Sequence, residues 1–265
     1  MNKKYQVNEN FFKTWTEESA YILGWIMSDG CINYIPQKKY EIRFELADLE
    51  AIQKIRKAMG SNHPIRERND KGSKLYGLYI NSKKLVKQLL DLGVHTNKAK
   101  RLNWPNIPKE YEKDFIRGFF DGDGSVRINN KKNNRKQLTS FFGSICKPFL
   151  EKLGQVLRDE IELIPKIYED TPGFYKLHYG GKESHALYRY MYKDATIYLN
   201  RKKEKFEEAI EIKAGIGLAK CKRCGEEIVR ISNRQKWCAD CKKEVLREQW
   251  RKKYQRQKAR RSQKI

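Results

Sequence analysis

Two aspartates stand in matching surroundings, 94 positions apart in the chain. Asp29 and the glycine after it end the segment AYILGWIMSDG, and Asp123 ends DFIRGFFDGDG in the same way. A glycine also precedes each aspartate by five positions, Gly24 in the first segment and Gly118 in the second. Carboxylate oxygens suit Mg²⁺, and a metal held in this way can activate water and stabilise a leaving oxygen. The pair predicts divalent-metal chemistry, provided that the fold brings the two carboxylates together.

Four of the six cysteines form a second candidate site. Their spacing is Cys221-x2-Cys224-x13-Cys238-x2-Cys241. Two CxxC pairs of this kind bring four thiolates to one tetrahedral Zn²⁺, and a short segment with few apolar side chains needs such a metal to fold. Disulfide bonds are the alternative, which is disfavoured because no secretory signal accompanies the cysteines. The spacing predicts a structural zinc site.

Each aspartate is expected at the C-terminal end of a helix that carries small residues. Ser28 lies four residues after Gly24, and Gly122 lies four residues after Gly118, so each helix presents a stripe of small side chains on one face. We expect the two stripes to pack in parallel and form the helix interface. This packing would set the two aspartates side by side at negative helix ends, which is tolerable only if a proton or a cation lies between them.

The predicted ligands of the catalytic Mg²⁺ or Mn²⁺ follow from this packing. They are the two aspartates with oxygens of the neighbouring small residues: Asp29, Asp123, Ser28 and Gly122. A single Asp-Gly pair would indicate a turn that ends a helix, but two in register behind matching stripes favour the metal site. Gly30 and Gly124, which follow the aspartates, are expected to form left-handed exit turns.

The elements that would position these helices are repeated within residues 1–213. After each motif helix come a polar-alternating run, a helical pattern, two strand-like runs joined by a turn, and a closing helix. They fall at residues 40–46, 49–59, 65–69, 74–81 and 82–92 in the first half, and at 136–142, 149–157, 166–170, 174–180 and 182–192 in the second. We predict two half-domains, residues 1–107 and 108–213, related by a pseudo-twofold axis.

The chain is strongly basic, with 57 Lys and Arg residues against 33 Asp and Glu and a formal net charge of +24. Lys and Arg displace counterions from a phosphate backbone, so this charge favours a nucleic-acid partner, with an anionic membrane surface as the weaker alternative. The longest apolar run is far shorter than the ~20 residues of a membrane helix, and the chain starts without a signal-peptide core. We expect an intracellular protein of the cytoplasm, nucleoid or an organelle.

The C-terminal part of the chain carries half of the net charge. Residues 220–265 contain 17 Lys and Arg and five acids, behind a predicted linker, AGIGLA, at residues 214–219. Trp250 and Tyr254, four apart, can share a helix face, and Arg251 and Lys252 are expected to bind DNA phosphates. We predict a zinc module with a basic helical tail, for which RNA or protein contact is the alternative.

The two motif segments resemble the signature helices of a LAGLIDADG homing endonuclease in its single-chain form. They read ILGWIMSDG at residues 22–30 and IRGFFDGDG at residues 116–124, and the resemblance covers about residues 12–213. It implies an α+β fold of duplicated αββαββα half-domains, whose two antiparallel sheets form a DNA-binding saddle. Met27, Ser28 and Leu23 depart from the family letters at structural positions. The tail resembles the small zinc-ribbon modules that are appended to DNA-binding proteins.

The resemblance also implies an activity and its residues. It implies a site-specific double-strand DNA endonuclease, which hydrolyses one phosphodiester on each strand of a long asymmetric site and promotes the spread of its intron or intein. The catalytic acids would be Asp29 and Asp123, which bind the metals. Similar basic residues line the family's active sites, so Lys98, in TNKAK, and Lys202, in LNRKK, are candidates to neutralise the phosphorane.

Alternating strand runs supply the candidate DNA contacts, because they place polar side chains on one sheet face that can enter a major groove. The candidates are Asn33, Arg43, Arg66, Arg68, Lys74, Tyr76, Arg127, Asn129, Gln137, Lys176 and His178.

Two other functions remain open at this stage. One is a DNA-binding regulator that does not cut, and the other is a cofactor for splicing of intron RNA, a maturase, on the same scaffold. We expect a monomer in either case, because the duplication already supplies the twofold symmetry of a dimer.

Overall fold

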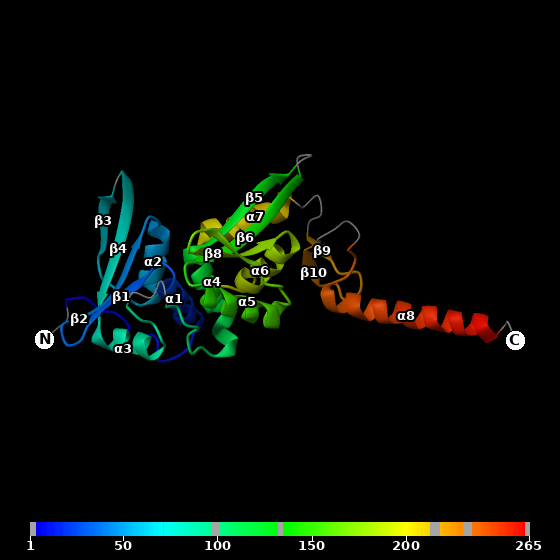
Figure 1. Cartoon of the computed structure of the whole chain (residues 1–265), viewed down its shortest axis with the longest axis horizontal. Helices are drawn as coiled ribbons and strands as arrows, with labels where there is room; N and C mark the ends of the chain where they lie inside the picture. The colour runs from blue at the N-terminus through cyan, green and yellow to red at the C-terminus, as the bar shows by residue number, and fades with distance from the viewer. Residues whose placement is uncertain are drawn as a thin grey trace. The chain divides into compact units, whose positions relative to one another are not determined.

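The computed structural model describes residues 4–70, 72–96, 101–131, 135–212, 218–229 and 235–262. The chain divides into two compact units, Met1–Phe206 and Glu207–Ile265. The first predicted half-domain and residues 108–206 of the second lie in the first unit, whereas residues 207–213 and the four cysteines lie in the second. Figure 1 shows the elements of both units. The boundaries assigned to the half-domains from the sequence stay predictions.

The first half is built from a four-stranded antiparallel sheet and its flanking helices. In chain order its elements are α1 (Glu17–Met27), β1 (Cys31–Ile35), β2 (Lys39–Leu46), α2 (Leu49–Ala58), β3 (Ile65–Asp70), β4 (Ser73–Asn81) and α3 (Lys83–Asp91). The strand order in the sheet is β1-β2-β4-β3. Apolar residues of β2 and β4, such as Ile42, Phe44 and Leu78, are fully buried and form the core of this half.

The second half repeats this arrangement. After a 3-10 turn, η2 (Lys109–Tyr111), come α4 (Glu112–Asp123), β5 (Gly124–Lys131), β6 (Arg135–Ser144), α5 (Lys147–Ile161), β7 (Ile167–Thr171), β8 (Phe174–Gly180) and α6 (Lys182–Tyr192). Its strand order, β5-β6-β8-β7, matches that of the first half. The predicted fold class, duplicated αββαββα halves with two antiparallel sheets, is therefore confirmed. A further helix, α7 (Asn200–Ile212), follows the repeat.

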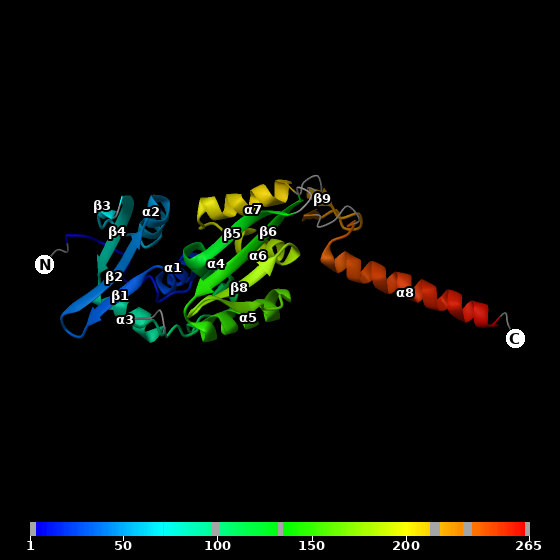
Figure 2. The same ribbon diagram turned by 45° about the horizontal axis from the view of Figure 1, so that its top comes forward.

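Helices α1 and α4 hold the two halves together (Figure 2). Thr16 and Ser19 begin α1 with a capping box, in which each side chain accepts a hydrogen bond from the other's backbone amide. A Cβ atom added at Gly24 would lie 2.5 Å from the backbone nitrogen of Phe119, and one at Gly118 would lie 2.8 Å from the carbonyl carbon of Tyr21. The glycines therefore allow the two helix backbones to touch, which explains why each helix tolerates a glycine in its middle.

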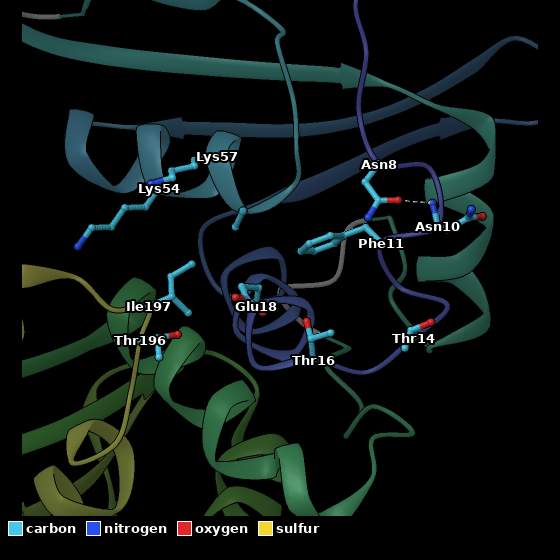
Figure 3. Close-up of a pocket in the computed structure, with 11 residues that line it drawn as sticks. Asn8, Asn10, Phe11, Thr14, Thr16, Glu18, Lys54, Lys57, Thr196 and Ile197 are labelled. Carbon is cyan, nitrogen blue, oxygen red and sulfur yellow. Dashed lines mark hydrogen bonds between the residues drawn. The ribbon is translucent and has the colours of Figure 1, made fainter.

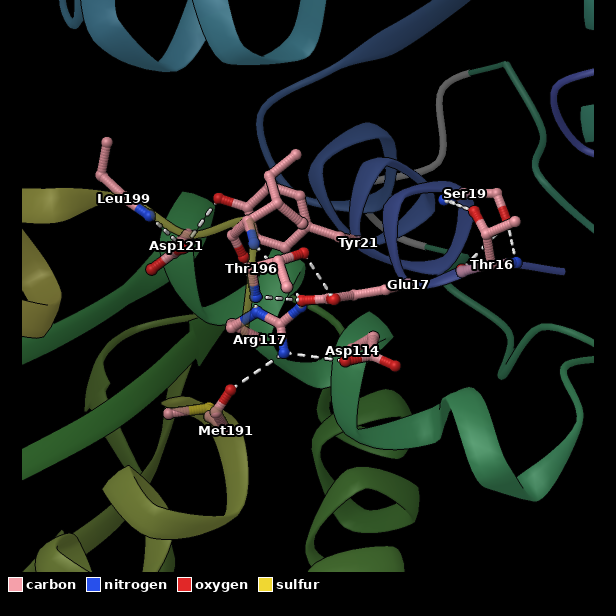
Figure 4. A network of polar contacts seen from close by, with 11 residues as sticks. Thr16, Glu17, Ser19, Tyr21, Asp114, Arg117, Asp121, Met191, Thr196 and Leu199 are labelled. Carbon is pink, nitrogen blue, oxygen red and sulfur yellow. Dashed lines mark hydrogen bonds and ion pairs between the residues drawn. The ribbon is translucent and has the colours of Figure 1, made fainter. Parts of the chain in front are cut away.

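A buried arginine reinforces this helix pair (Figure 4). Arg117 of α4 is 1% exposed, and it donates hydrogen bonds to Glu17 of α1 at 2.7 Å and to Asp114 at 2.8 Å. Its remaining donors reach the carbonyl oxygens of Met191 and Ile197, each at 2.9 Å. The guanidinium thus joins α1, α4 and the segment between α6 and α7.

The second unit contains a two-stranded ribbon and a long helix. β9 (Leu218–Lys220) pairs with β10 (Glu227–Val229), and α8 runs from Ala239 to Ser262. Most of the linker predicted at residues 214–219 lies outside the described residues, and Leu218 and Ala219 lie in β9. Within the described part of the chain, no helix has both the length and the apolar character needed to cross a membrane.

Candidate active site and nucleic-acid interface

The two repeated aspartates meet where α1 and α4 end. Asp29 lies two residues beyond the end of α1, Asp123 is the last residue of α4, and both are exposed. A Cβ atom added at Gly122 would lie 2.6 Å from Cβ of Ser28 and 3.4 Å from Oδ2 of Asp29. The carboxylate of Asp29 therefore lies over the backbone next to Asp123, although the two residues belong to different halves.

A cavity of about 1000 Å³ opens at this point. Its lining comes from both halves: Met27, Ser28, Gly30, Cys31, Ile32, Asn33, Tyr34, Arg43, Thr96, Leu102, Asp123, Gly143, Ser144, Ile145 and Phe174. Carboxylate oxygens at the edge of a cavity of this size can bind a divalent cation and leave room for phosphate oxygens. The residues present therefore fit a hard divalent metal.

The structure distinguishes among the four predicted metal ligands. The hydroxyl group of Ser28 donates to carbonyl oxygens of its own helix, those of Gly24 at 3.1 Å and Trp25 at 3.2 Å. The carbonyl oxygen of Gly122 accepts a hydrogen bond from a lysine at 3.1 Å. The two exposed carboxylates are the better cation ligands, so the geometry favours Asp29 and Asp123.

That lysine is Lys202, which lies under the end of α4. Its side chain is 4% exposed, and Nζ donates to four backbone carbonyl oxygens, those of Phe120, Asp121, Gly122 and Gly124, at 2.6 to 3.1 Å. Burial lowers the pKa of Lys202 to about 8, against the raising effect of the negative charges on Asp121, Asp29 and Asp123. An ammonium group so placed satisfies the carbonyls that a helix end leaves without partners.

The two lysines predicted to neutralise the phosphorane are thus placed differently. Lys98 lies outside the described residues. Lys202 is close enough to Asp29 and Asp123 to sense their charge, but its donors are engaged by the helix end. A direct contact between Lys202 and phosphate stays a prediction, and it requires the amine to leave these carbonyls.

The expectation of left-handed exit turns at the two motif glycines is wrong. Gly124 has φ of −82° and ψ of 163°, and Gly30 is not among the described residues with positive φ. Glycine is needed for space instead. A Cβ atom at Gly30 would lie 2.8 Å from Cα of Ile26 and from Phe44, and one at Gly124 would overlap Phe120. In each half, the glycine lies at a crowded junction between the motif helix and the strand that follows it.

A third acid of the motif segments is structural. Asp121 is fully buried, and its carboxylate accepts a hydrogen bond from the hydroxyl group of Tyr21 at 2.8 Å (Figure 4). The carboxylate accepts a second from the hydroxyl group of Tyr192 at 2.5 Å. It also accepts from the backbone amide of Leu199 at 2.8 Å. Burial raises the pKa of Asp121, which the nearby charge of Lys202 and these hydrogen bonds partly offset.

A second cavity, of about 680 Å³, lies at the other end of α1 (Figure 3). Its lining includes Thr14, Thr16 and Glu18 at the start of α1, together with Lys54 and Lys57 of α2. No pair of aspartates is among the residues that line it. The cavity beside Asp123 is therefore the candidate active site.

The exposed face of the first sheet carries four of the predicted DNA contacts. Strand pairing sets Asn33 opposite Glu41, Arg43 opposite Tyr79, and Arg66 opposite Gly77, and it puts Arg68 on the same side. Arg43 and Arg66 each lie over the ring of Tyr79, with the guanidinium carbon 5.3 Å from the ring centroid. Glu45 accepts from Arg43 and from the Tyr79 hydroxyl, both at 2.5 Å.

Lys74 and Tyr76 lie on the other face of that sheet. Tyr76 pairs with Leu46, two residues along each strand from the buried pair of Phe44 and Leu78, and therefore lies on the same face as that pair. Lys74 forms an ion pair with Glu67 at 2.7 Å. Their contact with DNA stays a prediction, which the register does not favour. The sequence reasoning missed Tyr79 and Glu45. The only signal for Glu45 was the alternating run that it shares with Arg43, and for Tyr79 it was the strand-like run at residues 74–81.

The second sheet places all five of its candidates on one face. Asn129 pairs with Gln137 and Arg127 with Thr139, and Phe141 pairs with His178 beside Lys176. Lys176 lies over the Phe141 ring at 4.6 Å and forms an ion pair with Asp170 at 2.7 Å. Burial lowers the pKa of His178; the charge of Glu183 opposes this shift, and the charges of Lys166 and Lys176 add to it.

The four tail cysteines come together in the second unit. The sulfur atoms of Cys221, Cys224, Cys238 and Cys241 all lie within 4.8 Å of one another. The amide of Cys238 donates to Sγ of Cys221 at 3.3 Å, and that of Cys241 donates to Sγ of Cys238 at 3.4 Å. Four converging sulfurs with amide donors fit a tetrahedral Zn²⁺ site. Arg251 and Lys252 lie on α8, and both are exposed.

Comparison with known proteins adds a family and a fold. A family model described as LAGLIDADG-like domain matches residues 16–92 and 110–211. The fold is similar to the homing endonuclease I-WcaI bound to its DNA recognition sequence (TM-score 0.51, 18% identity, 75% of this chain and 91% of that chain). It is also similar to the LAGLIDADG meganuclease I-AabMI bound to uncleaved DNA (TM-score 0.53, 12% identity, 76% and 92%).

Two curated relatives come from Methanocaldococcus jannaschii. A probable translation initiation factor IF-2 is 32% identical over 155 residues, which are 56% of this chain and 12% of that protein. An uncharacterized protein is 27% identical over 154 residues, 52% of this chain and 55% of its own length. The matched region thus covers about half the length of the uncharacterized protein and a much smaller part of the initiation factor.

Proposed function

The chain belongs to the LAGLIDADG-like domain family, and from this premise we propose that it is a site-specific endonuclease that cuts both strands of DNA. The observation that supports the proposal is the approach of the Asp29 carboxylate, from one half, to Gly122, the residue before Asp123 in the other half, next to a cavity that Asp123 lines. The two sheets of the duplicated fold present basic and polar side chains on their exposed faces, which suits a DNA duplex. The chain would act as a monomer because each half supplies one acid.

The residues of the site divide the chemistry among them. Mg²⁺ or Mn²⁺ held by Asp29 and Asp123 would activate water and stabilise the leaving 3′ oxygen. Lys202 fixes the end of α4 and thereby the position of Asp123, while Arg117 fixes the pairing of α4 with α1. Arg43, on the sheet face and at the cavity, is placed to hold a phosphate of the bound strand near the acids.

The experiment that tests this function is cleavage of a randomised DNA library with Mg²⁺. We expect the wild-type protein to cut both strands at a small set of related sites. Asp29→Asn and Asp123→Asn should each lower the cutting of both strands by at least ~100-fold while binding is retained, because the two acids share the metal region. Asp91→Asn, which removes the exposed carboxylate of the last residue of α3, is the matched control.

A different result would move the protein to another class. Tight binding without any cutting, in the presence or absence of Mg²⁺, would make it a DNA-binding regulator. Tighter binding to a structured intron RNA than to any DNA would favour the splicing cofactor. In both cases the aspartate pair would be part of the helix ends rather than a metal site.

We also propose that the four tail cysteines bind one structural Zn²⁺. The convergence of their sulfur atoms supports this, as do the amide hydrogen bonds to two of them. Metal analysis of the purified full-length chain should give one zinc per molecule, and a mercury reagent should release that zinc as four thiols react. Release of no zinc would contradict this part of the proposal.

A further inference from the structure

The long C-terminal helix α8 separates its acids from its aromatic residues. Residues four apart follow one ridge along a helix, so α8 carries four such rows. One row, the acidic row, begins with Asp240, Glu244 and Glu248 and continues with Lys252. Every acid of α8 lies in this row. The row is offset by two residues from a second row, the aromatic row, which therefore lies about 200° around the helix.

The acidic row is held by the cysteine knuckle. Arg223 lies between Cys221 and Cys224, and its Nη2 atom contacts Glu248 at 2.9 Å and Glu244 at 3.3 Å. These ion pairs join the first half of α8 to the loop that carries two of the zinc-site cysteines. They fix which side of the helix faces the knuckle, and so they direct the aromatic row away from it.

The aromatic row is exposed along its length. It consists of Lys242, Leu246, Trp250 and Tyr254, of which Leu246 is 53%, Trp250 73% and Tyr254 60% exposed. They are the large apolar side chains that are exposed among the described residues of the second unit. Three large apolar side chains at helical spacing, left in water beside a folded knuckle, indicate a surface that binds a partner.

A row of cations runs directly beside the aromatic row. It contains Lys243, Arg247 and Arg251, each one residue after a member of the aromatic row, and all three are exposed. None of the three forms an ion pair with the acidic row in the described residues. The aromatic and cationic rows together form an acid-free face, which we call the α8 binding face.

We propose that the α8 binding face is a second DNA-binding surface of this protein, which holds the phosphate backbone of duplex DNA while Trp250 and Tyr254 lie against sugars and base edges. The proposal rests on the proposed function, because it takes DNA as the polyanion. Charge complementarity selects the partner, since the face is basic and free of carboxylates. A 24-residue helix is about 36 Å long, and the major groove of DNA admits a helix of its width.

The test compares residues of the α8 binding face with residues of the second unit that lie outside it. Arg251→Gln and Lys222→Gln each remove one exposed positive charge, but Arg251 lies in the α8 binding face and Lys222 lies in the cysteine knuckle. Trp250→Ala and Gln249→Ala form a second matched pair. Binding of the full-length protein to a labelled random-sequence duplex is measured by fluorescence anisotropy without added Mg²⁺, at several salt concentrations.

We expect Arg251→Gln to weaken binding roughly 5- to 10-fold at 0.1 M salt and to lower the slope of log K against log salt by about 1. Trp250→Ala should weaken binding roughly 5- to 10-fold. Lys222→Gln and Gln249→Ala should each change it less than ~2-fold. Arg223→Gln, which releases the acidic row, should reproduce part of the loss although Arg223 is not on the face.

Three results would overturn the inference. Equal effects of Arg251→Gln and Lys222→Gln would show a diffuse basic unit without a preferred face. A duplex RNA bound more tightly than the DNA, with the same residues responsible, would make the partner RNA. If no variant of the α8 binding face changes DNA binding, the exposed side chains of the aromatic row would be assigned to a protein partner instead. The endonuclease proposal is judged separately, because the Mg²⁺-dependent cutting rate at saturating protein depends on Asp29 and Asp123 and not on these variants.

Discussion

At the scale of single residues, the approach of Gly122 to Ser28 sets how closely the two aspartates meet. A methyl group at Gly122 would lie 2.6 Å from Cβ of Ser28, which is too close without movement of a helix. We expect Gly122→Ala to lower the free energy of unfolding by about 1–2 kcal/mol, since overpacking exceeds the gain in helix propensity. Urea denaturation measures the loss.

The matched test is the exchange of the two small residues. In the double variant Gly122→Ala/Ser28→Gly the methyl group finds the space that the serine side chain leaves. We expect this variant to recover most of the lost stability, as residues in contact do when both change. A double variant that is less stable than Gly122→Ala would show that the stripes do not pack as the structure has them.

Lys202 gives a second prediction at this scale. Lys202→Met keeps the length of the side chain but leaves four buried carbonyl oxygens at the end of α4 without their donor. We expect a loss of about 3 kcal/mol in the free energy of unfolding, together with a loss of cutting, because Asp123 is no longer fixed. Loss of cutting with full stability would instead indicate direct contact between the amine and phosphate.

The sequence was sufficient to locate both aspartates and their small-residue stripes, because motif spacing and helical periodicity are local properties. It was not sufficient to place Lys202, whose amine reaches α4 from a segment about 80 residues later in the chain. The role of Gly30 and Gly124 was also misjudged. A glycine required by a crowded neighbour has the same letter as one required by a positive φ, and only the packing distinguishes them.

At the scale of elements, the pairing of α1 with α4 depends on the carboxylate of Glu17. Burial raises the pKa of Glu17, but hydrogen bonds from Thr196 and the charge of Arg117 outweigh it and lower the pKa below 4.5. A carboxyl group whose pKa is lower in the folded state stabilises the fold above pH 4.5, and this stability is lost as the pH falls through the folded pKa.

We therefore expect Glu17→Gln to lose about 2 kcal/mol at pH 7, because the buried Arg117 loses one of its two carboxylates. The stability of the variant should also fall less than that of the wild type between pH 5 and pH 3. Glu18→Gln, in the same helical turn, is the control for the helix dipole. Equal pH dependence of the two variants would show that Glu17 does not carry this effect. Urea denaturation at each pH is the measurement.

The order of elements was predictable because both halves repeat it, and a pattern seen twice is hard to misassign. Strand register was not. The sequence grouped Lys74 and Tyr76 with Arg66 and Arg68 as one polar set, yet a strand alternates its side chains between two faces. Which face each residue takes depends on its pairing partner, and the pairing of Tyr76 with Leu46 places it on the side of the core.

At the scale of the whole molecule, stability is expected to be divided between the two compact units. The first unit buries an extensive core, while the second has Cys221 and Ile228 as its buried apolar residues among those described beyond residue 217. A unit with so small a core depends on its metal, because binding free energy of a structural zinc is folding free energy. The first unit has no such dependence.

Removal of the zinc-site thiols should therefore separate the two units. We expect the full-length variant Cys221→Ser/Cys224→Ser to lose the unfolding transition of the second unit, while the main transition of the first unit keeps its midpoint. The variant should still cut DNA with Mg²⁺ at low salt, since Asp29 and Asp123 are untouched. Its DNA binding should weaken and depend less steeply on salt, because α8 is no longer held by the knuckle.

Calorimetry measures the unfolding transitions, and cleavage assays over a salt series measure cutting and binding. The control is the wild-type protein, stripped of zinc and then reconstituted. A shift of the main transition by more than a few degrees would mean that the units stabilise each other and that the zinc module is part of the catalytic fold.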